Sequence, residues 1–474
     1  MEQKRAPLFT ALCTHAERAE KGNFHVPGHK EGQAYDLEGE KYFAPLLALD
    51  MTELPHLDDL HHPAGVIAES QQLAASAFGA KHTFFLVGGS TAGNLAAILC
   101  TMQRGDQLLV PRNAHQSVFH ACILAGVRPI YIGAEIDEGT GLCAPIEVEQ
   151  LEVVYTEYPD VKGLLLTSPH YNGMYEKVEE VAIWCRQKQL LLLVDEAHGA
   201  HFPFHKELPL SAVQCGADVV VQSTHKMLPA MTMSSMLHLG SNRVSPQEIQ
   251  RWLRIIQSSS PSYPLMASLD LARRWMVERG ETELERVIGL LTQLRTKLSK
   301  LSYLRETSKP YPRDPFKLLL ETTTGVTGYA LAQLLEERGC YCELADPMRV
   351  LIVCSAATLA EELDLLWKSL LEIDSIVQKN SMKRQQRKCP TLKNTAALPL
   401  DQLTKAPTEK IALIKASGRV AAETVIPYPP GIPVLLPGEE ISVEMVDYLV
   451  DILQAGGQVR GLTSVSTPLI DVVK

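Results

Sequence analysis

The sequence is short of features that would point to membranes or nucleic acids. No run of apolar residues approaches the length of a membrane span, and the start, MEQKRAPLFT, has no apolar signal core. Positive charge is in deficit, because 45 Lys and Arg face 55 Asp and Glu and leave a formal net charge of -10. A protein that binds nucleic-acid phosphates would carry clustered basic residues. We therefore expect a cytoplasmic protein that binds neither membranes nor nucleic acids.

Paired cysteine spacing is lacking as well. Ten cysteines are scattered from Cys13 to Cys389, and although Cys340 and Cys342 lie two apart, no second pair completes a zinc site. We interpret the cysteines as reduced thiols and expect no metal. With 474 residues, of which 46% are hydrophobic and 21% charged, the chain can form two or three domains with large cores.

Apolar segments alternate with amphipathic helical patterns between residues 51 and 270. The segments that read as strands are TFFLV (83–87), DQLLVP (106–111), RPIYIG (128–133), GLLLTS (163–168), LLLLVDEAH (190–198) and ADVVVQS (217–223). Because they are apolar throughout, they predict a mostly parallel sheet covered by helices on both faces. The predicted fold class is therefore α/β, with residues 51–270 as the large domain.

The flanking regions predict further parts. Residues 1–50 are irregular and are interpreted as an N-terminal arm. Residues 271–375 begin with one long charged helix (271–301) and continue as a smaller α/β domain, with strands at PFKLLLET and MRVLIVCS. Residues 376–408 are polar and basic and predict a linker, whereas residues 409–474 predict a compact C-terminal segment.

Three chemical features follow strands of the predicted sheet. The first is LVGGSTAGN, which opens a helix and can offer backbone N–H groups and hydroxyls to an anion from Gly88, Gly89, Ser90 and Thr91. The second is Asp195, with His198 and His201 close behind, and the third is Lys226 after VVVQSTH. Because ligands bind beyond the carboxyl ends of parallel strands, we expect these features in one site.

One cofactor requires all three features. Pyridoxal 5'-phosphate needs its phosphate held, its ring nitrogen kept protonated by a carboxylate, and its aldehyde linked to a lysine. We expect Asp195 to keep the ring nitrogen protonated and Lys226 to form the covalent link to the aldehyde. Burial lowers the pKa of a lysine, which makes the amine a better nucleophile.

Each feature also has an ordinary structural explanation. The small residues of GGSTAG allow a helix to pack closely on a strand, and an Asp after a strand is commonly a cap or turn residue. His198, His201 and His205 can ligate a metal, but their spacing does not force such a site. His115, in RNAHQSVFHA, can simply begin a helix. The order of all the features on one sheet favours the cofactor hypothesis.

Several motifs resemble those of the Orn/Lys/Arg decarboxylase family. They are FHVPGHKEG (24–32), DDLHHPAGVI (58–67), VDEAHGAHF (194–202), QSTHK (222–226), SSSPSYPLMASLD (258–270) and YPPGIPVLLPGE (428–439). The resemblance spans most of the chain, and the sequence is similar to the short bacterial form of the family. It implies an aspartate-aminotransferase-like fold, pyridoxal phosphate as cofactor, and decarboxylation of arginine, lysine or ornithine toward a polyamine or diamine. We expect arginine or lysine ahead of ornithine, because their side chains reach farther toward a carboxylate that binds the cationic end.

The resemblance also implies roles for single residues. Lys226 matches the lysine that binds the cofactor, Asp195 the partner of the ring nitrogen, and His115 the imidazole stacked on the ring. His198 would lie near the ring hydroxyl, and Glu439 matches an acidic position near the substrate side chain. The implied phosphate contacts are Ser90, Thr91, Ser223 and His225, although GGST stands where the family more often has GT[ST].

The resemblance further implies a homodimer, since the family's active site lies at a subunit interface. The SSSPSYP loop (258–264) is the candidate segment for reaching the partner's site, together with the HVPGHK segment.

Two other functions compete with the decarboxylase. An aminotransferase needs an arginine that holds the substrate carboxylate, and Arg349 in DPMRVLIVCS is a candidate. A decarboxylase releases neutral CO₂, so a tight clamp on the carboxylate would stabilise the ground state instead. A non-catalytic homologue with a binding role would be expected to lose Lys226 or Asp195, and both are present.

Overall fold

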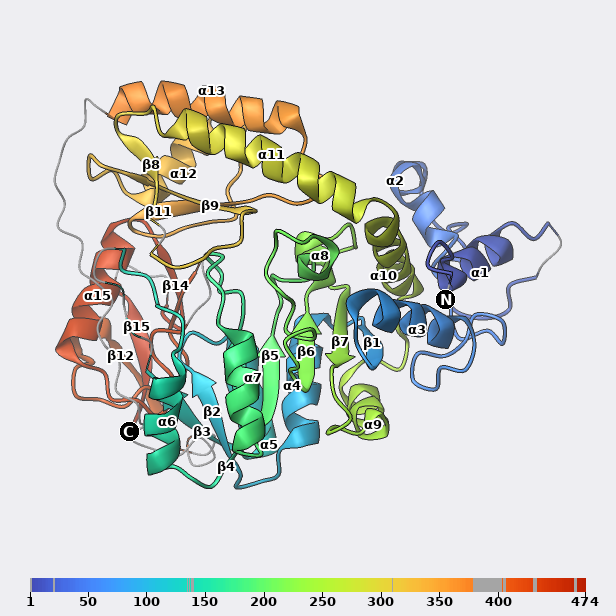
Figure 1. Ribbon diagram of the computed structural model, residues 1–474, viewed down its shortest axis with the longest axis horizontal. Helices are drawn as coiled ribbons and strands as arrows, with labels where there is room; N and C mark the ends of the chain where they lie inside the picture. The colour runs from blue at the N-terminus through green and yellow to red at the C-terminus, as the bar shows by residue number, and fades with distance from the viewer. Residues whose placement is uncertain are drawn as a thin grey trace. The chain divides into compact units, whose positions relative to one another are not determined.

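The computed structural model describes residues 2–19, 22–133, 135, 137, 140–308, 310–377, 403, 406–428, 433–463 and 467–474 (Figure 1). The chain forms two compact units, each made of two separate stretches. The first unit is Met1–Thr101 with Leu191–Leu284, and the second is Met102–Leu190 with Glu285–Lys474. The predicted linker, residues 376–408, lies largely outside the described residues.

The largest sheet has seven strands in the order β1-β7-β6-β5-β4-β2-β3. Strands of the first unit are β1 (His82–Leu86), β5 (Leu191–Asp195), β6 (Val219–Gln222) and β7 (Ser235–Leu239). Strands of the second are β2 (Gln107–Pro111), β3 (Arg128–Ile132) and β4 (Val161–Thr167). Because β7 is antiparallel to β1 and β6, while β2 with β3 and β5 with β6 are parallel, the sheet is mostly parallel. This confirms the predicted α/β class.

Strand β7 is not evident from the sequence. Its segment SMLHL is buried at every position, but Ser235 and His238 interrupt the apolar run that signals a buried strand. His238 is accepted in the core because its ring nitrogens contact Thr83 and Gln222. A polar residue that is fully hydrogen-bonded by distant partners leaves no signal in the local pattern.

The first unit also contains helices, some of which pack on its strands. They are α1 (Pro7–Ala16), α2 (Leu37–Leu47), α3 (Val66–Phe78), α4 (Gly89–Thr101), α8 (Thr224–Met227), α9 (Pro246–Ile256) and α10 (Tyr263–Trp275). Helix α4 packs on β1, β5, β6 and β7, and α3 packs on β1. The helix predicted over 271–301 is interrupted by a π-helical turn at Met276–Gly280, after which α11 (Glu281–Leu298) begins.

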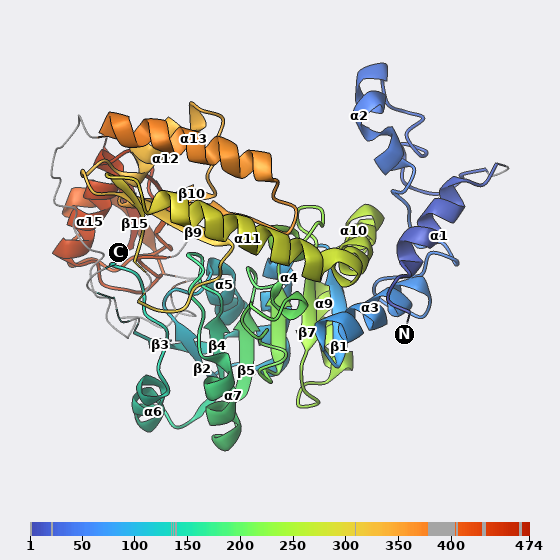
Figure 2. The ribbon, with the colours of Figure 1, turned by 45° about the horizontal axis from the view of Figure 1, so that its top comes forward.

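The second unit adds a four-stranded antiparallel sheet, in the order β10-β11-β9-β8. Its strands are β8 (Leu304–Glu306), β9 (Lys317–Thr322), β10 (Leu344–Ala345) and β11 (Arg349–Val353). Helix α11 and helix α13 (Ala360–Val377) run side by side along this sheet, with α12 (Gly328–Glu336) beside them (Figures 1 and 2). The two strands predicted at PFKLLLET and MRVLIVCS are therefore present as β9 and β11.

The rest of the second unit consists of three helices beside β2–β4 and the C-terminal segment. The helices are α5 (Gln116–Ala125), α6 (Val148–Glu157) and α7 (Val178–Gln187). The C-terminal segment pairs β12 (Thr408–Ala412) with β15 (Leu469–Val473) and β13 (Ile426–Tyr428) with β14 (Gln458–Arg460), and it contains α15 (Val443–Gln454). Its own apolar core includes Val425, Leu435, Leu449 and Val472.

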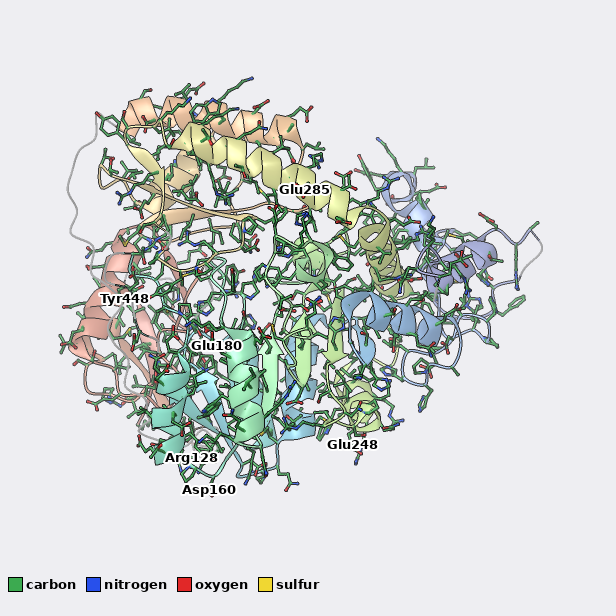
Figure 3. All side chains as sticks on the ribbon, in the orientation of Figure 1. Arg128, Asp160, Glu180, Glu248, Glu285 and Tyr448 are labelled. Carbon is green, nitrogen blue, oxygen red and sulfur yellow. The ribbon has the colours of Figure 1, made fainter. Side chains whose placement is uncertain are left out.

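Outward-facing helix positions carry charge. Glu180 of α7 and Glu248 of α9, for example, are exposed (Figure 3). None of the cysteines that the structure describes forms a disulfide. Within the described ranges, no helix combines the length and apolar character that crossing a membrane requires.

Candidate active site

The Gly-rich turn after β1 opens α4 at Gly89, which has a φ of 71°. That left-handed conformation favours glycine. A Cβ on Gly93 would lie 2.6 Å from Val221 Cγ1, so glycine also lets α4 pack directly on β6. Ser90 Oγ accepts a hydrogen bond from Ser223 Oγ over 2.8 Å, whereas Thr91 is exposed. The start of α4 and the segment after β6 are thus brought together.

Asp195, at the end of β5, is only 3% exposed. Asn94 of α4 donates from Nδ2 to Asp195 Oδ2 over 2.9 Å, and the backbone N–H of Ala197 donates to Oδ1 over 3.1 Å. Two donors therefore hold the carboxylate in one orientation inside the unit. Asn94 is not revealed by a sequence motif; it lies one helical turn after Ser90 and is a buried polar residue among small and apolar neighbours.

Lys226 does not end the strand as predicted. Strand β6 ends at Gln222, and Lys226 lies in the short helix α8, whose backbone turns because Lys226 N–H donates to the Ser223 carbonyl over 3.0 Å. Lys226 is half-buried, and its Nζ lies 3.1 Å from Nε2 of the buried His198. The amine therefore has a specific imidazole neighbour.

His225 points to a different partner. Its Nδ1 lies 2.9 Å from the carbonyl of Ser234. Burial is the main cause that lowers the pKa of His225, and the charge of Lys226 lowers it further, whereas the bond to Ser234 opposes both. The ring is thus neutral near pH 7. A phosphate contact by His225, as implied by the family resemblance, stays a prediction.

His115 lies in the second unit, where it is the N-cap of α5. Its ring nitrogen Nδ1 accepts from the backbone N–H of Ser117 over 3.3 Å and lies 2.9 Å from the Ser117 hydroxyl. The expected helix-start role is therefore present. Stacking on a cofactor ring stays a prediction.

Glu439 also lies in the second unit and is 6% exposed. Arg112 donates to both carboxylate oxygens, with Nη2 at 2.8 Å from Oε2, and the Leu436 N–H donates to Oε2 over 2.8 Å. Arg112 is itself buried and lies over the ring of Tyr131. The negative charge of Glu439 is therefore already balanced within the chain, which the sequence analysis did not foresee because the two residues are 327 positions apart.

Arg349 begins β11 and is 3% exposed. Its Nη2 donates to the Thr140 carbonyl over 2.7 Å, and its Nε lies 3.4 Å from Asp346 Oδ2. Its Nη1 has no hydrogen-bond partner in the part of the chain that the structure describes. Arg349 is thus a buried cation whose guanidinium contacts are made through Nη2 and Nε.

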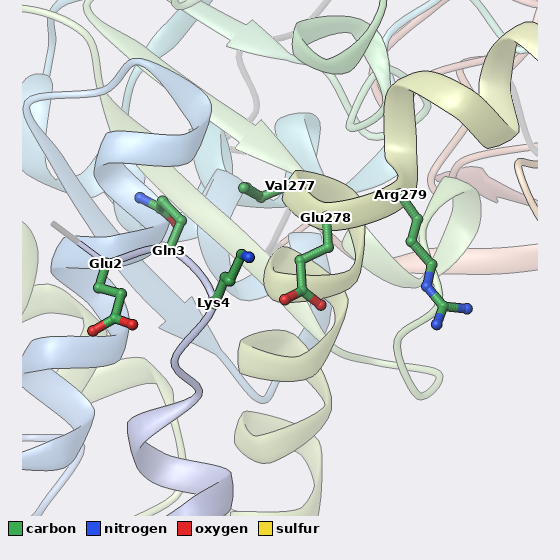
Figure 4. A pocket seen from close by; sticks show the side chains of 6 residues that line it. All are labelled: Glu2, Gln3, Lys4, Val277, Glu278 and Arg279. Carbon is green, nitrogen blue, oxygen red and sulfur yellow. The ribbon is translucent and has the colours of Figure 1, made fainter.

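A surface pocket elsewhere in the first unit contains none of the predicted site residues (Figure 4). It is lined by Glu2, Gln3, Lys4, Val277, Glu278 and Arg279. These side chains come from the N-terminus and the π-helical turn, and neither Asp195 nor Lys226 lines the pocket.

The residues of the first unit suit pyridoxal phosphate. A helix start next to two serine hydroxyls can hold a phosphate, a buried and fixed carboxylate can face a ring N–H, and an amine lies in the same unit. No cluster of three or more metal-ligating side chains occurs among the described residues.

Comparisons with known proteins agree with this donor set. The Orn/Lys/Arg decarboxylase major domain matches residues 6–312, and the C-terminal domain of the same family matches residues 379–464. The Bacillus subtilis arginine decarboxylase is 36% identical over 486 residues, covering 100% of this chain and 99% of that protein. The uncharacterised B. subtilis protein YaaO is 39% identical over 463 residues, covering 96% of each.

Solved structures show the same fold. A lysine decarboxylase of Francisella novicida has a TM-score of 0.86 at 20% identity and covers 99% of this chain and 81% of its own. A ureidoglycine–glyoxylate aminotransferase of B. subtilis has a TM-score of 0.55 at 15% identity, over 68% of this chain and 87% of its own. The chain therefore belongs to the pyridoxal-phosphate-dependent Orn/Lys/Arg decarboxylase family, in a short form homologous to the arginine decarboxylases of Bacillus.

Proposed function

We propose that this chain binds pyridoxal phosphate and decarboxylates a basic amino acid, arginine or lysine ahead of ornithine. The observation that carries the proposal is the arrangement in the first unit, where Asn94 fixes the buried Asp195 and Lys226 Nζ contacts His198. Family membership and the relatives named arginine decarboxylase support the substrate class.

The residues have separable tasks. When bound, pyridoxal phosphate accepts the electron pair left on the substrate carbon as CO₂ departs. Asp195 keeps a negative charge against the ring N–H, and Asn94 prevents its carboxylate from turning away. Ser90 and Ser223 offer hydroxyls, and the start of α4 offers N–H groups, to the phosphate.

Lys226 and His198 can move a proton. A neutral His198 accepts a hydrogen bond at Nε2 from the ammonium group of Lys226, which keeps Nζ aimed in one direction. Loss of a proton from Nζ makes the amine nucleophilic, and regaining it makes Lys226 a proton donor to the substrate carbon. His115 and Glu439 are assigned the ring-stacking and side-chain-recognition roles as proposals only.

We further propose that the protein acts as a homodimer. Large apolar side chains of the N-terminal arm are exposed, with Phe24 at 99%, Leu37 at 87% and Tyr42 at 70%. Val26, Tyr35 and Phe43 are exposed next to them in sequence. Apolar side chains gathered in one exposed segment favour a partner surface, and a second copy of this chain is the partner we propose.

A single assay tests the reaction. The purified protein should absorb light at about 420 nm when loaded with the cofactor. Arginine, lysine, ornithine and norleucine are then supplied separately, and released CO₂ and keto acid are both measured. CO₂ with the corresponding amine from a basic amino acid supports the proposal. A keto acid without CO₂ would support the aminotransferase alternative, with Arg349 as the carboxylate-binding residue.

A further inference from the structure

A chain of buried polar side chains crosses the first unit. It joins Glu196, Gln222, His238 and Thr83, each at most 4% exposed. Gln222 Nε2 donates to Glu196 Oε2 over 2.7 Å, Gln222 Oε1 lies 3.1 Å from His238 Nε2, and His238 Nδ1 lies 2.8 Å from Thr83 Oγ1. The Ala212 N–H donates to the other Glu196 oxygen over 2.7 Å. Both oxygens of the buried Glu196 carboxyl group therefore accept a hydrogen bond.

This row of hydrogen-bonded side chains lies on the sheet face opposite α4. Asp195 pairs with Val221, and Val221 contacts α4 at Gly93. Successive side chains along a strand alternate between the faces. Gln222, the next residue on β6 after Val221, therefore points to the other face, and Glu196, which follows the last residue of β5, is hydrogen-bonded to Gln222 there. Two carboxylates that are adjacent in sequence are thus held from opposite faces.

The hydrogen bonds all point toward Glu196. Burial lowers the pKa of His238 to about 3, so its ring is neutral near pH 7. We assign the proton to Nε2, which then donates to Gln222 Oε1, while Nδ1 accepts from the Thr83 hydroxyl. Burial raises the pKa of Glu196 to about 8, although the bonds from Gln222 and Ala212 oppose that shift. Glu196 is therefore the final acceptor in this row of hydrogen bonds.

The same residues adjoin the predicted cofactor residues. Glu196 follows Asp195, and its backbone N–H donates to the Val221 carbonyl over 2.9 Å, which joins the ends of β5 and β6. Gln222 precedes Ser223. A Cβ on Gly199 would lie 2.6 Å from Glu196 Cγ, so the turn after His198 is built closely around this side chain.

We propose that Glu196 is a positioning residue for the cofactor-binding segments. By accepting from Gln222 and Ala212 it fixes the ends of β5 and β6, and so the separation of Asp195 and Lys226. The inference rests on the proposed function and extends it to a residue that touches neither cofactor nor substrate.

The test compares Glu196→Leu with Glu196→Gln. Leucine removes both acceptors at similar volume, and we expect kcat to fall about 10- to 100-fold with KM little changed, because small misplacements of catalytic groups slow the chemical step. The introduced amide of Glu196→Gln still accepts from Ala212 and can donate to Gln222 once the Gln222 amide turns over. Its kcat should stay within about threefold of the parent, as expected when hydrogen bonds rather than charge are needed.

Asp218 provides the matched control at the opposite ends of the same strands. It is 2% exposed and accepts from the Leu192 N–H over 2.9 Å and from Arg243 Nη1 over 3.0 Å. Asp218→Leu should lower the thermal midpoint, as Glu196→Leu does, but leave kcat of the folded enzyme unchanged. Equal losses of kcat in both variants would show general destabilisation and overturn the proposal, as would an unchanged kcat in Glu196→Leu.

A second readout does not depend on decarboxylation. Pyridoxal phosphate is added to each variant, borohydride is used to fix it, and the label on the peptide with Lys226 is measured over time. Labelling should be slowed in Glu196→Leu and normal in Asp218→Leu. If the parent labels Lys226 but releases no CO₂ from any basic amino acid, the proposed function fails while this test still decides the positioning role. If Glu196→Leu does not fold, the double variant Glu196→Leu with Gln222→Leu is used in its place. It removes the acceptor and its donor together, so the Gln222 amide is not left buried without its partner.

Discussion

At the scale of single residues, Lys226 is the strongest assignment in the proposed mechanism. Lys226→Ala should abolish the visible band of the bound cofactor and all turnover, because Nζ beside His198 is the group assigned to hold the cofactor. Borohydride labelling followed by peptide mapping locates the modified lysine. Lys177→Ala, which removes an exposed amine paired with Glu147, is the control and should change neither property. A label on another lysine would refute the assignment.

The Asp195 carboxylate tests the electrostatic part of the mechanism. Asp195→Asn keeps the shape of the side chain but removes the charge that faces the ring nitrogen. We expect kcat to fall by roughly 100- to 1,000-fold, the range seen when one preorganised electrostatic group is removed. Cofactor affinity, measured by titration of the visible band, should weaken less. Near-normal turnover would mean that the wrong carboxylate was chosen.

Glu439 is predicted to read the cationic end of the substrate, yet it already pairs with Arg112. A substrate cation would therefore have to share the carboxylate. Glu439→Gln should raise KM for arginine or lysine, and it should also cost roughly 3–5 kcal/mol of unfolding free energy because the buried Arg112 loses its carboxylate partner. Steady-state kinetics and denaturant unfolding measure the two effects.

The double variant Arg112→Met with Glu439→Met separates these effects. Replacing both charges together restores much of the stability. If KM stays high, Glu439 contacts the substrate; a return to the parental KM would confine Glu439 to its pair with Arg112. Equal activity of the parent on norleucine would show that the pocket does not select substrates by the charge at the end of the side chain.

At the scale of elements, α4 carries both Ser90 and Asn94 and is placed by Gly93. Gly93→Ala adds a Cβ 2.6 Å from Val221 Cγ1 and 2.8 Å from Leu86 Cδ1, so α4 must shift. We expect a loss of roughly 1–3 kcal/mol in unfolding free energy and weaker cofactor binding, since both polar residues move with the helix. Thermal unfolding and cofactor titration measure them.

Gly289→Ala is the control for that prediction. Gly289 lies in α11, and a Cβ there would meet nothing within 4 Å. Alanine should therefore stabilise the helix by roughly 0.5–1 kcal/mol and leave cofactor binding unchanged. A Gly93→Ala variant that behaves like Gly289→Ala would contradict the close packing of α4.

Local patterns predicted most elements near the site, because long apolar runs and a Gly-rich turn are local signals. Asp195 and Ser90 were found in this way. Asn94, Arg112 and Glu196 were missed because each acts through a partner far along the chain. The α8 turn at Lys226 was also missed, since four residues carry too little periodicity to reveal a helix.

At the scale of the whole molecule, the exposed apolar arm predicts self-association. We expect sedimentation to give a homodimer or a larger homo-oligomer. Replacing Leu37 and Tyr42 with Ser should weaken it, because both side chains are exposed on α2. Leu365→Ser, at an exposed apolar position on α13, is the control and should leave assembly unchanged. A fully active monomer would contradict the proposal.

The pair between Arg112 and Glu439 sets an order on biosynthesis. Arg112 leaves the ribosome 327 residues before its partner, which at 5–20 residues per second is a delay of about 16–65 seconds. Throughout that time Arg112 lacks the carboxylate to which both of its terminal nitrogens donate in the folded chain. A nascent or truncated chain that stops before Glu439 should therefore leave this part of the unit open to proteases, and completion of the chain is what closes it.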